Sequence, residues 1–270
     1  MKNLPWHTKL VLALLAFVPL YFMVAAFGTR IGIWDWKLGL MTLTLGGGMI
    51  LLGIAALAAL VSLGLGVRGT PRRNGVLAVA IIGLLMPAAA LAVFLGMGNK
   101  AAGNPIHDIA TDTGNPPAFS ESTMAAREAA GANPLSDYQV PLGQLPLYAE
   151  RTAPELAVKS HAQIITARPD RPAPLPLGGA SKAEGTAAVA AAMAAMGLTD
   201  IRQDPASGMV EGVATSFWFG FKDDVVARVG DAQIDFRSVS RVGISDLGAN
   251  TARIAELRQR TEALLGAASR

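Results

Sequence analysis

Residues 217–250 read FWFGFKDDVVARVGDAQIDFRSVSRVGISDLGAN, and this stretch decides the fold of the C-terminal half. Aromatic and β-branched residues alternate with polar ones in two runs, and Gly230 and Asp231 supply a turn between them. Ser245 and Asp246 then offer side chains that cap the start of a helix. The stretch therefore predicts an antiparallel β-meander that leads into a helix.

The neighbouring sequence extends this pattern into a domain over residues 181–270. Ser181 followed by Glu184 has the spacing of a capping box, which predicts a helix over residues 181–196. The last helix is expected to reach about Leu265. Strands are predicted over residues 198–203, 209–217, 224–229 and 233–239. A β-meander flanked by helices is a two-layer α+β fold.

Residues 104–180 have a different composition and are predicted to form an extended, proline-rich arm. Eleven of the chain's 16 prolines fall between Pro105 and Pro176. Residues 106–119 carry enough apolar side chains to lie against the domain. Residues 120–142 are rich in alanine, glycine and serine and are expected to be mobile.

Three long apolar runs dominate residues 1–103, at residues 9–27, 38–67 and 76–97. Each is near or above the roughly 20 residues that cross a hydrocarbon core. The chain is therefore predicted to start with a three-helix transmembrane bundle. The first run also resembles a cleaved signal peptide, but it exceeds the usual apolar signal core of about 7–15 residues.

The charge distribution predicts an orientation in the membrane. Residues 1–103 contain eight Lys and Arg but one acid, whereas residues 104–270 contain 15 Lys and Arg and 19 acids. Positively charged loops stay in the cytoplasm. If the three runs cross a membrane, one membrane side carries Lys2, Lys9, Arg68, Arg72 and Arg73. The other side carries Arg30, Lys37 and Lys100. The bias predicts a multi-pass protein of the bacterial inner (plasma) membrane with a cytoplasmic N-terminus and a periplasmic C-terminal domain.

Several classes of function have no sequence signal. The chain has no cysteine, so disulfides and thiolate chemistry are excluded. The basic residues flank the apolar runs, so the lipid bilayer is a predicted partner and nucleic acid is not. No glycine-rich phosphate loop, nucleophile elbow or His-Glu-x-x-His pattern occurs, and the sequence predicts no catalytic residue and no cofactor.

Three motifs carry a resemblance to a known family. They are IHDIATDTGNPPAF at residues 106–119, WFGFKDD at residues 218–224 and RSVSRVGISDLGAN at residues 237–250. In this order they resemble the bacterial and plastid family catalogued as domain of unknown function 1499, from about Asn104 to the C-terminus. The resemblance implies no activity and no catalytic residue.

The end of the 217–250 stretch contains a hypothetical anion site. The free backbone N–H groups and the dipole of a helix N-terminus attract anions. A phosphate or a lipid headgroup is the predicted ligand, and it would be held by Arg237, Arg241, Ser245 and Asn250. The carboxylate of Asp246 competes for the same position, because it caps the helix itself.

Asp223 and Asp224 are the candidate acids of the chain. Adjacent residues of a strand point to opposite faces, so the two carboxylates do not form a catalytic pair on one substrate. Arg237 and Arg241 share one face of the next predicted strand. The pattern favours a structural ion pair between one of the acids and one of these arginines.

Two further groups contain residue types that occur in binding sites. His107 lies beside Asp108 and near Asp112, but His161 is far along the chain, so no metal site is predicted. Trp218 and its neighbouring phenylalanines resemble the apolar floor of a lipid or quinone site. Their alternation along a predicted strand favours packing in the core instead.

Two functions remain open from the sequence. The first is a non-enzymatic binding or assembly factor for an envelope or membrane-complex partner. The alternative is a hydrolase-like envelope enzyme that acts on lipid or cell-wall material through Asp223 or Asp224 with Arg237 and Arg241.

Overall fold

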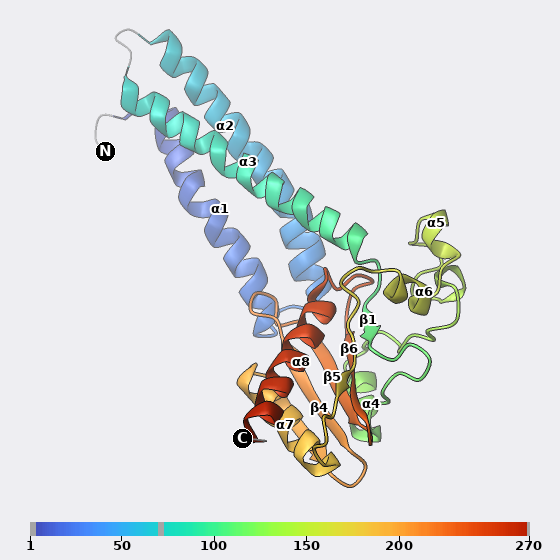
Figure 1. Cartoon of the computed structure of the whole chain (residues 1–270). Helices are drawn as coiled ribbons and strands as arrows, with labels where there is room; N and C mark the ends of the chain where they lie inside the picture. The colour runs from blue at the N-terminus through green and yellow to red at the C-terminus, as the bar shows by residue number, and fades with distance from the viewer. Residues whose placement is uncertain (1–3, 70–72, 269–270) are drawn as a thin grey trace. The chain divides into compact units, whose positions relative to one another are not determined.

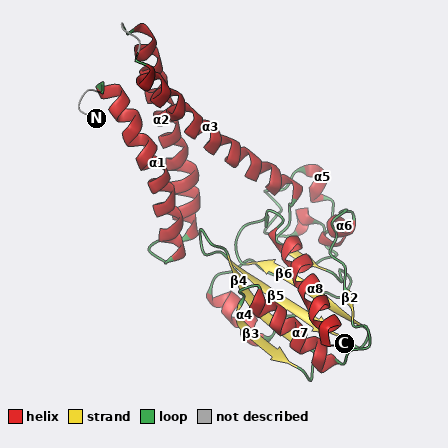
Figure 2. Cartoon of the chain, turned by 60° about the vertical axis from the view of Figure 1, so that its left-hand side comes forward, coloured by secondary structure: helices red, strands yellow, loops and turns green. Residues whose placement is uncertain are grey.

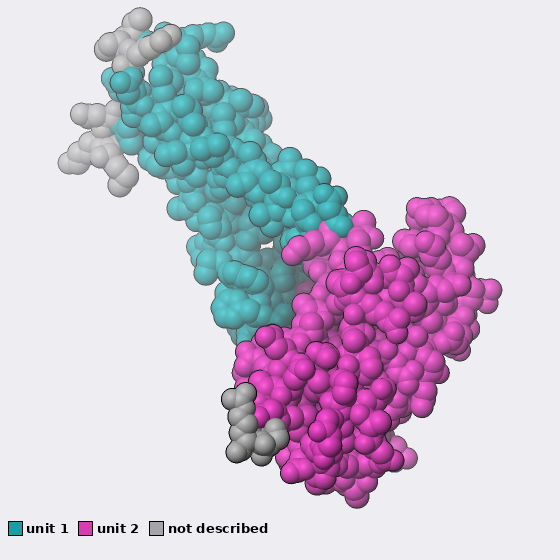
Figure 3. Space-filling view, in the orientation of Figure 1, with its two compact units in different colours: residues 1–99, 216–220 teal, residues 100–215, 221–270 magenta. Residues whose placement is uncertain are grey.

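The computed structural model describes residues 4–69 and 73–268. The chain divides into two compact units, which Figure 3 colours teal and magenta. Unit 1 holds the residues up to Asn99 together with Ser216–Gly220, and unit 2 holds Lys100–Thr215 with the residues from Phe221 onward. Lys2 and Arg72, two of the charges behind the predicted orientation, lie outside the described residues.

Unit 1 is built from long apolar helices (Figure 1). They are α1 (Trp6–Arg30), the π-helical η1 (Lys37–Gly47), which continues into α2 (Gly48–Arg68), and α3 (Asn74–Gly103), which belongs to unit 1 as far as Asn99. By length and composition, three helices can cross a membrane: Trp6–Arg30, Lys37–Arg68 and Asn74–Gly103. The prediction of three such helices is confirmed. Because α1 starts at Trp6, it also contains His7, whose Nδ1 lies 2.8 Å from Ser62 Oγ.

Small residues allow the helices of unit 1 to pack closely. Ala55 and Ala59 are buried, and Gly83 faces Ala59 and Val11. A Cβ at Gly83 would lie 2.5 Å from a methyl group of Val11, so this position requires glycine. Gly53, by contrast, faces open space.

Unit 2 is an α+β domain around an antiparallel sheet, drawn in yellow in Figure 2. Its strand order is β1-β6-β5-β4-β3, and the short β2 also pairs with β6. The strands are β1 (Asp108–Ala110), β2 (Leu175–Pro176), β3 (Thr199–Asp204), β4 (Met209–Thr215), β5 (Lys222–Val229) and β6 (Gln233–Ser240). The predicted meander corresponds to β3 to β6 and is confirmed.

Two helices, α7 (Lys182–Ala195) and α8 (Ala249–Ala268), cover one face of the sheet (Figures 1 and 2). The Ser181 and Glu184 capping box forms as predicted. Apolar residues of both helices and of alternate sheet positions make the core, which includes Val189, Met193, Phe236, Ile254 and Leu257. Burial of these side chains is the main stabilisation of the domain.

The proline-rich arm contains more regular structure than its composition predicts. It contributes β1, β2 and four short helices: α4 (Glu121–Ala129), η2 (Leu142–Gln144), α5 (Pro154–Ala157) and α6 (His161–Thr166). The expected mobile segment 120–142 begins with α4, which Ser120 caps through the backbone N–H of Thr123. Alanine favours a helix once it is capped, and the buried Arg127 fixes α4 to the sheet. The segment therefore begins with a regular helix that its composition did not predict, and its mobility stays a prediction.

The aromatic run at the start of the 217–250 stretch is a turn. β4 ends at Thr215, two residues earlier than predicted, and residues 217–219 form a turn. Gly220 follows the turn with a φ of +69°, a conformation that favours glycine. Phe217 and Trp218 are 65% and 53% exposed, so the expectation that they pack in the core is wrong. Both belong to unit 1.

Candidate functional site

The sheet face that turns away from α7 and α8 carries a network of buried charges. Asp108 in β1 and Arg237 in β6 form a bidentate ion pair. Arg237 donates from Nε to Oδ1 of Asp108 at 3.0 Å and from Nη2 to Oδ2 at 2.7 Å. Tyr138 donates a third hydrogen bond to Asp108 at 2.5 Å. The Asp108 side chain is fully buried, and that of Arg237 is 5% exposed. The antiparallel pairing of β1 with β6 places both side chains on this face.

A second carboxylate on the same face binds two arginines. Asp224 accepts hydrogen bonds from Arg127 of α4 at 2.5 Å and from Arg241 at 2.6 and 2.9 Å. Its side chain is 1% exposed. The guanidinium groups of Arg127 and Arg237 both lie over the ring of Phe119, at 5.9 and 5.7 Å from its centroid. The two ion-pair groups are thus joined through one aromatic side chain.

Asp223 lies on the opposite face, as strand alternation predicts. It binds Arg253 of α8 at 2.7 Å. The expected ion pair between an acid of this pair and a β6 arginine forms between Asp224 and Arg241, whereas Arg237 uses Asp108 of the arm. None of the four charges is left without a partner.

The four residues of the hypothetical anion site do not converge on one cavity. Asn250 is buried against β6, where it accepts from Ser238 at 2.7 Å and donates to the carbonyl of His107 at 2.8 Å. Arg237 and Arg241 lie on the other face of the sheet, and Ser245 accepts from the backbone N–H of Leu247. Asp246 accepts from the N–H groups of Gly248 and Asn250, so a carboxylate already occupies the helix start. Anion binding here stays a prediction, and these internal partners disfavour it.

The arm also encloses a cluster of two histidines and a tyrosine that sequence reasoning missed. The hydroxyl of Tyr148 lies 2.6 Å from Nδ1 of His107 and 3.4 Å from Nε2 of His161. Ser136 Oγ lies 2.9 Å from the same His161 nitrogen. The Nδ1 atom of His161 is buried and has no hydrogen-bond partner among the described residues. Within residues 4–69 and 73–268, no group of three or more potential ligands is placed to hold a metal ion.

Burial sets the protonation of this cluster. It lowers the pKa of His161 to about 4, and it also lowers the pKa of His107. Burial alone would raise the pKa of Asp108, but the charge and hydrogen bonds of Arg237 lower it below its usual value. At neutral pH the histidines are therefore uncharged and Asp108 is ionised.

We expect acid to destabilise unit 2 from pH 6.5 downward. The unfolded chain binds a proton at His161 near pH 6.5, whereas the folded chain binds it only near pH 4. In that window the unfolded state holds more protons at His161, so this histidine lowers the free energy of unfolding by about 1.4 kcal/mol per pH unit as the pH falls. Urea unfolding of the full chain in detergent at pH 7, 6 and 5 measures this slope. His161→Gln should flatten it, and an unchanged slope in that variant would contradict the assignment.

An open hollow lies where α4 meets β3 and β4, and it has a volume of about 430 Å³. Its lining residues are Ala118, Phe119, Ser120, Ser122, Arg202, Gln203, Asp204, Ser207, Met209 and Glu211. Glu211 forms the buried base, where it accepts from Ser120 Oγ and Thr123 Oγ1, both at 2.6 Å. Arg202 lies beside it at 3.1 Å with a side chain that is 49% exposed.

Local strand geometry creates this hollow. β3 is at the edge of the sheet, and its register shifts between Thr199 and Arg202, where Asp200 adopts a φ of +52°. The bulge sets Arg202 directly opposite Glu211. Burial alone would raise the pKa of Glu211, but hydrogen bonds from Ser120 and Thr123 lower it below its usual value. The hollow therefore has an ionised floor and an exposed cation at its rim.

Comparison with known proteins gives a match to a family. No curated protein and no solved structure matches the chain. The sequence model of a family described as "Protein of unknown function (DUF1499)" matches residues 108–260, which run from β1 into α8. This match agrees with the resemblance carried by the three motifs. The chain belongs to the DUF1499 family.

Proposed function

We propose that this protein is a membrane-anchored binding or assembly factor. In this proposal, the helices of unit 1 hold it in the bacterial inner membrane. Unit 2 lies in the periplasm, where it binds an envelope or membrane-complex partner. The hollow between α4, β3 and β4 is the observation that carries the proposal.

The accessible lining of the hollow is mostly apolar, and polar groups stand around its rim. Its rim offers the hydroxyls of Ser122 and Ser207, the amide of Gln203 and the guanidinium of Arg202. All four residues are exposed. The adjacent β3 pairs only with β4 in the described sheet, so its outer edge also presents backbone groups. An extended partner segment with apolar side chains for the lining and polar groups for the rim and the strand edge fits this combination.

The enzymatic alternative finds less support. Asp224 and Arg237 are enclosed and bound to internal partners, and Asp223 is paired with Arg253. A catalytic acid or base must reach the substrate proton directly or through one water. Asp224 and Arg237 have no such access, and Asp223 is held by Arg253, so the acid and arginine cluster supports a structural role.

One pair of single-cysteine variants tests both the site and the orientation, because the natural chain has no cysteine. Ser122→Cys places a thiol at the rim of the hollow. Asp231→Cys is the control, because Asp231 is 99% exposed in the turn between β5 and β6. The reagent is a membrane-impermeant maleimide, applied to intact cells of the native host and to the purified protein.

The proposal predicts labelling of both thiols from outside the inner membrane. Ser122→Cys should react several-fold more slowly in cells than after purification, because a partner covers the hollow, whereas Asp231→Cys should react equally in both. Equal rates for Ser122→Cys in cells and after purification would contradict a bound partner. If both thiols react only after lysis, the domain is cytoplasmic and the orientation is wrong.

A further inference from the structure

Loop 216–220, the turn between β4 and β5, exposes two large aromatic side chains. Phe217 is 65% exposed and Trp218 is 53% exposed. Their rings contact each other edge to face, with centroids 5.2 Å apart. An exposed aromatic pair is costly in water, since each ring has about 150–250 Å² to bury. Transfer of the pair from water to an apolar environment would therefore be favourable.

Within unit 1, this loop contacts the last turn of α1. The ring of Phe27 lies 5.8 Å from that of Phe217 and 5.7 Å from that of Trp218. Gly220 allows the close approach, because a Cβ there would lie 3.2 Å from the Cα of Arg30. α1 is one of the three helices long and apolar enough to span a membrane. If α1 crosses the bilayer, its end at Arg30 is expected where the chain leaves the hydrocarbon.

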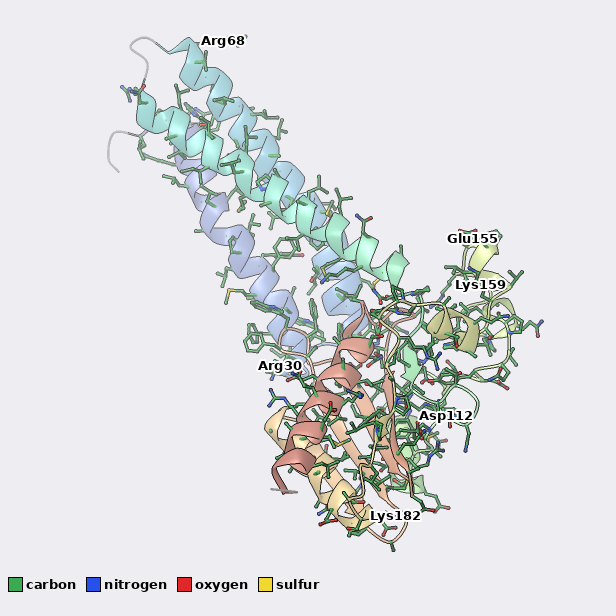
Figure 4. The ribbon with its side chains drawn as sticks, in the orientation of Figure 1. Arg30, Arg68, Asp112, Glu155, Lys159 and Lys182 are labelled. Carbon is green, nitrogen blue, oxygen red and sulfur yellow. The ribbon has the colours of Figure 1, made fainter. Side chains whose placement is uncertain are left out.

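Arg30, labelled in Figure 4, fixes the loop in this position. Its Nη1 donates to the carbonyls of Ser216 and Phe217, both at 2.7 Å, and its guanidinium lies 5.6 Å from the centroid of the Phe217 ring. Backbone carbonyls that enter a lipid environment need a hydrogen-bond donor. Arg30 supplies one for two of them, so these carbonyls need not stay in water.

The residues that follow α1 also include large apolar and aromatic side chains. Ile31 and Ile33 are 70% and 66% exposed, and Trp34 and Trp36 follow within the same short connection. Tryptophan is enriched at the level of the lipid headgroups, where an amphipathic ring has both apolar and polar neighbours. The 216–220 loop thus adds two aromatic residues to a segment with the composition of a membrane interface.

We infer that loop 216–220 is a lipid-contacting element: Phe217 and Trp218 lie in the headgroup and upper acyl region of the bilayer, beside the end of α1. The partner is the lipid surface itself. This inference does not depend on the hollow or on the proposed partner. It depends on α1 crossing the membrane and on the contacts between α1 and the loop.

The cysteine-free chain allows a direct test. Trp218→Cys and, separately, Phe217→Cys are labelled with an environment-sensitive fluorophore in the full-length protein. Asp231→Cys is the matched control, because it lies in another β-turn and is 99% exposed. Each labelled protein is reconstituted into phosphatidylcholine and phosphatidylglycerol vesicles. Lipids brominated near the headgroup serve as one quencher and aqueous iodide as the other.

The inference predicts that brominated lipid quenches most of the emission from positions 217 and 218 and none from position 231, whereas iodide gives the opposite order. If iodide quenches all three labels equally, the loop is in water and the inference is wrong. If neither quencher reaches positions 217 and 218, the loop is covered by protein, which also overturns lipid contact. Both probed side chains are exposed, so their replacement leaves the core of unit 2 intact.

Discussion

Replacing Arg237 by methionine is expected to lower the free energy of unfolding of unit 2 by about 3–5 kcal/mol. The change removes the only cation that contacts the fully buried carboxylate of Asp108 among the described residues. The hydroxyl of Tyr138 remains as a donor, but a neutral donor does not compensate a buried charge. Methionine keeps much of the side-chain volume, so the loss reports on the charge and not on a cavity.

Urea unfolding of the full chain in detergent, followed by far-ultraviolet circular dichroism, measures this loss. Arg260→Met is the matched control, because Arg260 forms an exposed ion pair with Glu256 one helical turn away. Such a pair contributes about 0.3–0.5 kcal/mol. A loss for Arg237→Met no larger than that for Arg260→Met would show that the Asp108 pair does not stabilise the domain.

The second large effect is expected from Asp224→Asn. Asp224 is the shared partner of Arg127 and Arg241, whose side chains are 3% and 12% exposed. Neutralising it leaves two guanidinium groups close together without a carboxylate. We expect a loss of about 3–5 kcal/mol in the free energy of unfolding, and we expect α4 to become more accessible to protease because Arg127 fixes it to the sheet.

The neighbouring carboxylate is a close control for this variant. Asp223→Asn changes the same chemical group on the same strand, but Asp223 has one arginine partner and is 14% exposed. A loss of about 1 kcal/mol is expected there, because solvent already screens part of the interaction. Equal losses for the two variants would contradict the difference in environment that separates the two faces of the sheet.

Local patterns predicted the parts of the fold whose causes are local. The capping box at Ser181 needs only two residues three positions apart, and it forms as expected. The alternation in β5 and β6 depends on the period of an extended chain, so their positions were correct within a few residues. The three apolar runs depend on length and hydropathy alone. The separation of Asp223 from Asp224 follows from the same strand period.

The candidate sites were harder to predict, because their residues come from distant parts of the chain. Arg127 and Asp224 are 97 residues apart, and Asp108 and Arg237 are 129 apart. Only the pairing of β1 with β6 and the packing of α4 decide these contacts. The histidine cluster could have been suspected, because His107 and His161 are the only histidines after the apolar runs. Their proximity still required the arm to fold back on itself.

The sequence by itself determined three apolar helices, an antiparallel meander with flanking helices, and membership of the DUF1499 family, because each depends on spacing or order along the chain. Only the tertiary structure decided which arginine forms an ion pair with which carboxylate. Arg237 and Arg241, the arginines of the predicted anion site, are bound to carboxylates of the arm and of β5. A buried charge without a partner costs far more free energy than a buried ion pair. The tertiary structure also decided that Phe217 and Trp218 belong to a turn beside α1 and not to the core. An aromatic run of this kind is compatible with a buried strand and with an exposed loop, and only its contacts distinguish the two.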